Sequence, residues 1–140
     1  MKASIYLLDT NILSDVIKNP RGHAARRLIQ VEPERLCTSI IVVAEMRYGI
    51  EKKSSPELAR RVHQILNAIP VLPLDRNTDC HYGQIRAQLE REGMIIGAND
   101  LFIAAHARMK DAILVTDNIK EFSRVQDLKV ENWLLERPAE

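Results

Sequence analysis

The chain has 140 residues, of which 46% are hydrophobic and 28% are charged, and its net charge is +1. This balance is typical of one soluble globular domain, and the apolar stretch at the start is far too short for a signal peptide or a membrane span. The cysteines, Cys37 and Cys80, have no CxxC spacing and no zinc pattern around them. We therefore expect a cytoplasmic protein with reduced thiols.

Strands and helices alternate along the chain, and no repeat or linker interrupts them. Short apolar runs between polar residues predict strands at 4–8, 35–39, 71–74, 112–116 and 128–133, with Pro73 indicating an edge or an irregular end. Helical periodicity predicts helices at 11–18, 23–31, 40–52, 56–69, 77–93 and 100–110. Ser39 and Pro56 suit helix starts and Gly93 suits a helix end. The alternation predicts a single α/β domain over residues 1–140, with a central parallel sheet flanked by helices.

Acidic side chains follow the strands of this predicted sheet. Asp9 follows the first strand, Asp117 and Asn118 follow the strand at 112–116, and Asp100 begins a helix. In an open parallel sheet, ligands bind beyond the carboxyl ends of the strands, where strand order reverses. We therefore expect these three carboxylates to converge at one edge.

Glu45 adds a fourth acid from within an apolar helix. Helical spacing puts it on one stripe with Ile41 and Tyr48, and no Lys or Arg lies four residues before or after it. A carboxylate among apolar neighbours is costly unless it is paired or holds a cation.

Each acid also has a purely structural interpretation. Asp9 or Thr10 suits the N-cap of the following helix, and Asn99 or Asp100 suits the N-cap of the helix at 100–110. The sequence Asp117-Asn118 after a strand is ordinary turn chemistry, and most glutamates are solvated. The functional interpretation gains because all four acids are predicted at one edge of one sheet.

A cluster of oxygen ligands without histidine favours Mg²⁺ or Mn²⁺ over zinc. Close carboxylates repel one another without such an ion and shift one another's pKa values. The chemistry that uses these clusters is mostly phosphoryl transfer by metal-activated water.

Four stretches together resemble one known family: "LLDTNILSDVIK", "SIIVVAEMRYGIEK", "GQIRAQLEREGMIIGANDLFIAAHA" and "LVTDNIKEFSRVQDLKVENW". In this order they resemble PIN-domain proteins, and among these the VapC-type toxin ribonucleases. The resemblance implies an α/β/α sandwich and Mg²⁺- or Mn²⁺-dependent cleavage of RNA to a 3′-hydroxyl and a 5′-phosphate. It also implies a VapB-like antitoxin that blocks the site, and usually a homodimer.

The same resemblance assigns roles to individual residues. Asp9, Glu45 and Asp100 match the family's first three acids and would bind the metal, while Thr10 and Asn11 would orient the ligands. The fourth position departs from the family's pattern, since the family's residue falls at Asn118 whereas the acid here is Asp117. We expect a direct or water-mediated metal contact from one of the two.

Further residues are assigned more loosely. Arg86 lies in a stretch that the family carries beside the site, so it is a candidate RNA contact. His106 invites the role of general base, although a structural role is favoured. Aromatic residues are only 4% of the chain, which favours structured RNA such as tRNA over a long single strand. A catalytically silent binding module and a Mg²⁺-dependent phosphatase are the alternative functions.

Overall fold

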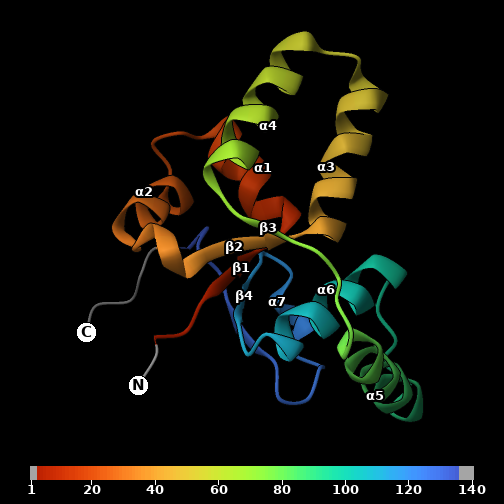
Figure 1. The fold of residues 1–140 in the computed structure, drawn as a ribbon. Coiled ribbons are helices and arrows are strands. Elements are labelled where there is room, and N and C mark those ends of the chain that lie inside the picture. The colour runs from red at the N-terminus through yellow and green to blue at the C-terminus, as the bar shows by residue number, and fades with distance from the viewer. Residues whose placement is uncertain (1–2, 136–140) are drawn as a thin grey trace.

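The computed structural model describes residues 3–135 (Figure 1). The strands are β1 (Tyr6–Leu8), β2 (Leu36–Ser39), β3 (Val71–Leu72), β4 (Ile113–Val115) and β5 (Lys129–Glu131). The helices are α1 (Thr10–Lys18), α2 (His23–Gln30), the 3₁₀ helix η1 (Pro33–Arg35), α3 (Ile40–Lys53), α4 (Pro56–Ala68), α5 (Thr78–Arg91), α6 (Ala98–Met109) and α7 (Ile119–Phe122).

The strands form one parallel sheet in the order β3-β2-β1-β4-β5. Tyr6 is aligned with Leu36 on one side and with Ile113 on the other. Helices cover both faces, with α1, α3 and α4 on one side of the sheet and α5, α6 and α7 on the other (Figure 1). A central strand in this arrangement has no solvent face, which explains why β1 is apolar at every position. The predicted α/β fold with a parallel sheet is confirmed.

The order of strands reverses once, beside β1. The chain moves outward from β1 to β2 and β3, then returns to the other side of β1 for β4 and β5. The carboxyl ends of β1 and β4 therefore flank the point where a ligand site is expected in an open α/β sheet.

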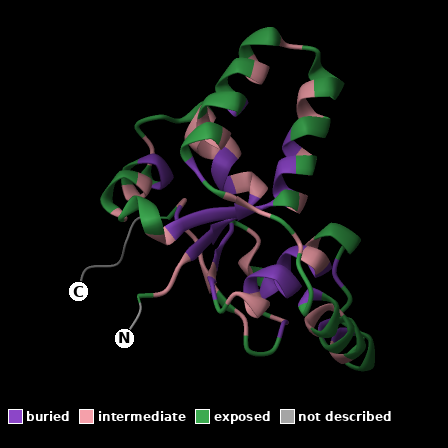
Figure 2. Cartoon of the chain, viewed as in Figure 1, coloured by how far each residue is buried: buried purple, intermediate pink, exposed green. Residues whose placement is uncertain are grey.

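The core fills the space on both sides of the sheet. Leu7, Leu8 and Leu114 are fully buried, and Phe122 of α7 is the largest side chain with no exposure. In Figure 2 strands β1 and β2 and the inner faces of the helices are buried, whereas the outer faces of α3, α4 and α5 are exposed. No helix within residues 3–135 is long and apolar enough to cross a membrane.

Several predicted boundaries were wrong by a few residues. The strand predicted at 71–74 ends at Leu72, just before Pro73, because proline cannot donate to a ladder. The helix predicted to begin at Asp100 begins at Ala98, so Asp100 lies in its first turn. Gly93 does follow the end of α5 with φ +66°, and the amide of Met94 donates to the carbonyl of Leu89 at 2.9 Å.

Two short helices were missed. The 3₁₀ helix η1 shortens the strand predicted at 35–39 by one residue. The four-residue helix α7 follows β4 and buries Phe122 under the sheet. This second omission matters for function, because α7 carries an acidic residue to the edge of the sheet.

Candidate active site

Asp9 lies at the carboxyl end of β1 and is only 4% exposed. Its backbone amide donates to the carbonyl of Val115 at 2.9 Å, which ties it to β4. Its side chain caps α1 by accepting the backbone N–H of Thr10 at 2.8 Å, and it also accepts the hydroxyl of Thr116 at 2.8 Å. The capping interpretation of Asp9 is therefore correct, and the same carboxylate faces the edge of the sheet.

Burial raises the pKa of Asp9 above its usual value, although the hydrogen bonds from Thr116 and Thr10 act in the opposite direction. The nearby carboxylate of Glu45 raises it further. A buried acid with another acid beside it is a frequent feature of functional sites, because burial and neighbouring like charges shift pKa values there.

Thr116 is the centre of a network that joins the ends of β1 and β4. It is fully buried, and its hydroxyl accepts the backbone N–H of Asn118 at 3.0 Å while it donates to Asp9. Asn11 donates weakly to Asp9 at 3.4 Å and accepts the backbone N–H of Asp117 at 2.9 Å. The predicted orienting role of Asn11 is consistent with these contacts. Thr116 was missed, since a threonine that ends a strand gives no distinctive sequence signal.

Glu45 reaches the site from α3 through Thr10. The hydroxyl of Thr10 donates to Glu45 Oε1 at 2.6 Å, across 35 residues of sequence. Glu45 is partly buried, so the cost of burial is offset by this hydrogen bond instead of by a basic partner. Tyr48, three residues further along α3, is 67% exposed, so it does not bury this carboxylate.

Asp100 brings a third element to the same place. Burial raises the pKa of Asp100 to about 6, and the carboxylates of Asp9, Glu45 and Glu121 raise it as well. Four acids from β1, α3, α6 and α7 therefore interact electrostatically at the reversal point of the sheet.

Glu121 is the acid of this site that the sequence did not predict. It lies on α7, is partly buried, and accepts the side-chain amide of Asn118 at 3.0 Å. Of the two residues predicted for the fourth position, Asp117 is exposed, and its carboxylate accepts the side-chain amide of Asn132 at 3.4 Å. It is not among the acids that raise the pKa of Asp100. The metal-binding role of Asp117 stays a prediction, and the geometry favours Glu121.

Arg86 and His106 lie outside this cluster. Arg86 is exposed on α5, and its contacts are with Tyr82 and Glu90 of the same helix. His106 is fully buried, and its Nδ1 atom is hydrogen-bonded to Ser39, the N-cap of α3, at 2.7 Å. Burial lowers the pKa of His106, as expected for a neutral histidine in a core. The structural interpretation of His106 is therefore supported.

Comparison with known proteins agrees with this geometry. The PIN domain family matches residues 6–128. The chain belongs to the PIN-domain family. Ribonuclease VapC2 of Haemophilus influenzae is 42% identical over 130 residues, which cover 92% of this chain and 98% of that protein. The tRNA(fMet)-specific endonuclease VapC of Salmonella typhimurium is 36% identical, with 91% and 97% covered.

Solved structures lead to the same family. The VapBC2 structure from Rickettsia felis, bound to a DNA fragment from its promoter, contains a chain that superposes with a TM-score of 0.86. That chain is 36% identical, and the match covers 92% of this PIN domain and 98% of the other chain. This level of identity places the chain among the VapC proteins of the family.

PIN domains of this kind imply a divalent metal ion, and the donor set fits one. Asp9, Glu45, Asp100 and Glu121 offer only carboxylate oxygens, which Mg²⁺ and Mn²⁺ prefer. Within residues 3–135, no three Asp, Glu, His or Cys side chains are as close together as in a formed metal centre. The mutual repulsion that raises the pKa of Asp100 is nevertheless the kind that a bound cation relieves.

Proposed function

We propose that this PIN domain is the toxin of a VapBC-type toxin–antitoxin system and acts as a Mg²⁺- or Mn²⁺-dependent endoribonuclease. The observation that carries the proposal is Asp100, whose pKa is raised to about 6 by burial and by three further acids from separate elements. Relatives of this chain in Haemophilus influenzae and Salmonella typhimurium are named as a ribonuclease and a tRNA(fMet)-specific endonuclease. We infer that the substrate is a structured RNA such as tRNA.

Asp9, Glu45 and Asp100 would hold the metal, together with Glu121 or Asp117. A divalent ion held by these residues would supply Lewis-acid chemistry, at a phosphate oxygen and at the attacking water. Cleavage by such a water leaves a 3′-hydroxyl and a 5′-phosphate. The histidine His106 is not needed as a base, and its burial against Ser39 keeps it away from the acids.

The residues around the acids fix their orientation. The hydroxyl of Thr116 and the backbone N–H of Thr10 hold the two oxygens of Asp9, so this carboxylate cannot rotate freely. The Thr10 hydroxyl in turn holds Glu45. Contacts of this kind typically change metal affinity or activity by about 10- to 100-fold when they are removed. The Asp9 carboxylate is therefore held in one orientation before any ligand arrives.

We also infer the partners from the relatives. The similar structures from Rickettsia felis and Salmonella typhimurium are VapBC complexes bound to DNA. By analogy, a VapB-like antitoxin binds this chain in the cytoplasm and blocks the acidic edge, and the toxin forms a homodimer.

The test is an RNA-cleavage assay on antitoxin-free protein with total cellular RNA. Reactions contain Mg²⁺, Mn²⁺ or EDTA, and compare the natural chain with Asp9→Asn. The matched control is Asp79→Asn, which removes an exposed carboxylate from the first turn of α5. We expect discrete fragments that require metal, disappear with Asp9→Asn and remain with Asp79→Asn. No cleavage by folded, metal-bound protein would contradict the proposal. It would favour a binding module, or a phosphatase to be tested on small phosphate esters.

A further inference from the structure

A groove lies between α2 and the carboxyl end of β5 with the chain that follows it. We call it the α2–β5 groove. Its volume is about 760 Å³, and the residues that line it are His23, Arg26, Arg27, Gln30, Ile119, Val130, Glu131, Asn132, Trp133 and Leu135.

One wall of the groove is a stripe of nitrogen-bearing side chains. His23, Arg26, Arg27 and Gln30 are spaced i, i+3, i+4 and i+7 on α2, so they share one face of the helix. The opposite face is apolar and buried, beginning with Ala24 and Ala25. A polar helix face usually meets open solvent, whereas this one faces a groove.

The other wall connects the groove to the acids. Asn132 lines the groove and donates its side-chain amide to Asp117 at 3.4 Å. Ile119, which also lines it, is the first residue of α7, two positions before Glu121. The backbone carbonyl of Glu131, also in this wall, accepts the backbone N–H of Thr116 at 2.9 Å, and the Thr116 hydroxyl donates to Asp9. A strand that lay in the groove would therefore lie beside the edge of the sheet that carries Asp9.

The charge of the groove is positive in its accessible part. Glu131 is the one acid that lines it, and Arg27 forms an ion pair with that carboxylate at 3.6 Å while packing over Trp133. Arg26 is exposed, and within residues 3–135 it has no carboxylate partner, since its contact is with His23 at 3.2 Å. The remaining N–H donors of the Arg26 guanidinium are available to a phosphate, which arginine binds through charge-assisted hydrogen bonds.

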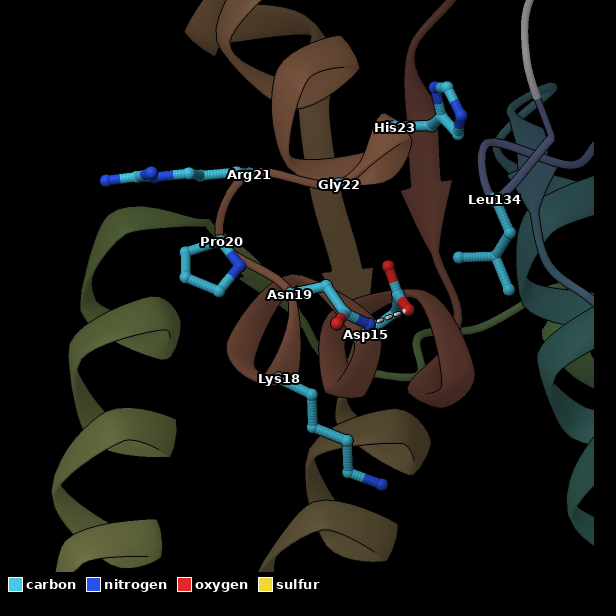
Figure 3. Close-up of a pocket in the computed structure, with 8 residues that line it drawn as sticks. All are labelled: Asp15, Lys18, Asn19, Pro20, Arg21, Gly22, His23 and Leu134. Atoms are coloured by element: carbon cyan, nitrogen blue, oxygen red, sulfur yellow. Dashed lines mark hydrogen bonds between the residues drawn. The ribbon is translucent and has the colours of Figure 1, made fainter.

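The neighbouring hollow lacks this arrangement. It shares His23 with the groove and is lined by Asp15, Lys18, Arg21 and Leu134, among others. In Figure 3 the side chains of Lys18, Arg21 and His23 point away from one another, and Asp15 is held by Asn19. Its basic groups do not converge on a common point, so it offers no comparable binding site.

We propose that the α2–β5 groove binds the sugar-phosphate backbone of the RNA next to the scissile phosphate, with Arg26 as its main phosphate contact. This inference rests on the proposed function, because it takes RNA as the substrate. Arg26 and Gln30 are positioning residues for the strand and take no part in bond cleavage. The groove would supply N–H donors to the phosphates of the RNA strand. The carboxylates would then need to bind only the metal ion at the scissile phosphate.

The test measures RNA affinity in the full-length Asp9→Asn protein, which keeps the probe intact. The probe is fluorescein-labelled bulk bacterial tRNA, and anisotropy is recorded at KCl concentrations from about 50 to 200 mM, where phosphate contacts are sensitive to salt. The added changes are Arg26→Glu and, as a second variant on the same stripe, Gln30→Glu. The matched control is Arg60→Glu on α4, another exposed helical arginine, in the arm that extends away from the sheet (Figure 1).

We expect Arg26→Glu to weaken tRNA binding at least tenfold and Gln30→Glu at least threefold, with Arg60→Glu within twofold of the parent. Arg26→Ala should make the slope of log affinity against log salt shallower by about one, as expected for one lost phosphate contact. Equal affinities for Arg26→Glu and Arg60→Glu would overturn the groove as an RNA site. So would a loss of antitoxin binding with unchanged tRNA affinity, because the groove would then bind protein.

Cleavage by the natural chain separates this inference from the proposed function. If the natural chain cleaves RNA and the single variant Arg26→Glu cleaves equally fast at subsaturating RNA, only the assignment of the α2–β5 groove as an RNA site is wrong. If the natural chain does not cleave RNA with either metal, the proposed function itself fails.

Discussion

Replacing Asp100 by Asn tests whether the four acids of the candidate site lie close enough to interact electrostatically. In the metal-free protein, burial and then the charges of Asp9, Glu45 and Glu121 raise the pKa of Asp100 to about 6. Asparagine has nearly the same shape but no charge. The substitution should therefore stabilise the metal-free protein at neutral pH, which is unusual for a residue proposed to be catalytic.

The size of the effect follows from the shift in pKa. A rise from 3.8 to about 6 corresponds to roughly 3 kcal/mol at about 1.4 kcal/mol for each unit. Asp100 is only partly buried, so solvent screening reduces this to about 1–2 kcal/mol. The lost attraction between the carboxylate and the first turn of α6 removes about 0.5 kcal/mol. We expect a net gain of about 1 kcal/mol in the free energy of unfolding.

The sign depends on pH. Because the folded pKa lies above the unfolded value, the contribution of Asp100 to stability is fully present below about pH 4 and is lost as the pH rises through 6. The advantage of Asp100→Asn should thus be absent at pH 3.5, appear between pH 4 and 6, and be complete by pH 7.5.

Urea unfolding in EDTA at fixed protein concentration measures this difference. Asp79→Asn in the first turn of α5 is the control, and it should be neutral or slightly destabilising at every pH. With Mg²⁺ in place of EDTA, the natural chain should regain stability that Asp100→Asn does not, because the ion binds only the folded state. A natural chain more stable than Asp100→Asn in EDTA at pH 7.5 would refute the electrostatic argument.

Three further predictions follow from the contacts of the site. Thr10→Val should lower Mg²⁺ affinity by about 10- to 100-fold, measured by calorimetry, because Glu45 loses its 2.6 Å hydrogen bond; Thr10→Ser should stay near the natural value. Glu121→Gln should weaken Mg²⁺ binding more than Asp117→Asn does. The opposite order would show that Asp117, and not Glu121, is the fourth metal ligand. His106→Ala should lower the free energy of unfolding in urea by about 2–4 kcal/mol, because the substitution leaves a cavity in the core. At a temperature where this variant is folded, its kcat should stay within threefold of that of the natural chain.

The sheet could be predicted because its signals are local. The apolar run before Asp9 is buried on both faces. A carboxylate directly after such a run therefore lies at the carboxyl edge of the sheet. Parallel strands bring their carboxyl ends to one edge, so Asp9 and Asp100 could be expected to meet without knowing any contact between them. The alternation of elements predicted the parallel sheet, whereas the order of its strands was not predicted.

The fourth acid could not be predicted in the same way. Helix α7 has only four residues, which is too short for hydrophobic periodicity to register. Its one signal is the spacing of Asn118 and Glu121, an N-cap residue followed three positions later by glutamate. The sequence Asp117-Asn118 looked like a turn, and it is the turn that directs Asp117 toward Asn132 and Glu121 toward Asp100.

The burial of Asp9 explains how one residue both caps a helix and serves a metal site. A carboxylate that is 4% exposed is costly, and the donors from Thr10 and Thr116 offset part of that cost without neutralising the charge. A lysine or arginine in their place would stabilise the metal-free fold more, but it would compete with a cation for the same oxygens. Neutral donors hold the carboxylate in position and leave its charge available. The remaining repulsion among the acids lowers the stability of the metal-free protein, and it is also the electrostatic energy that a bound divalent ion recovers.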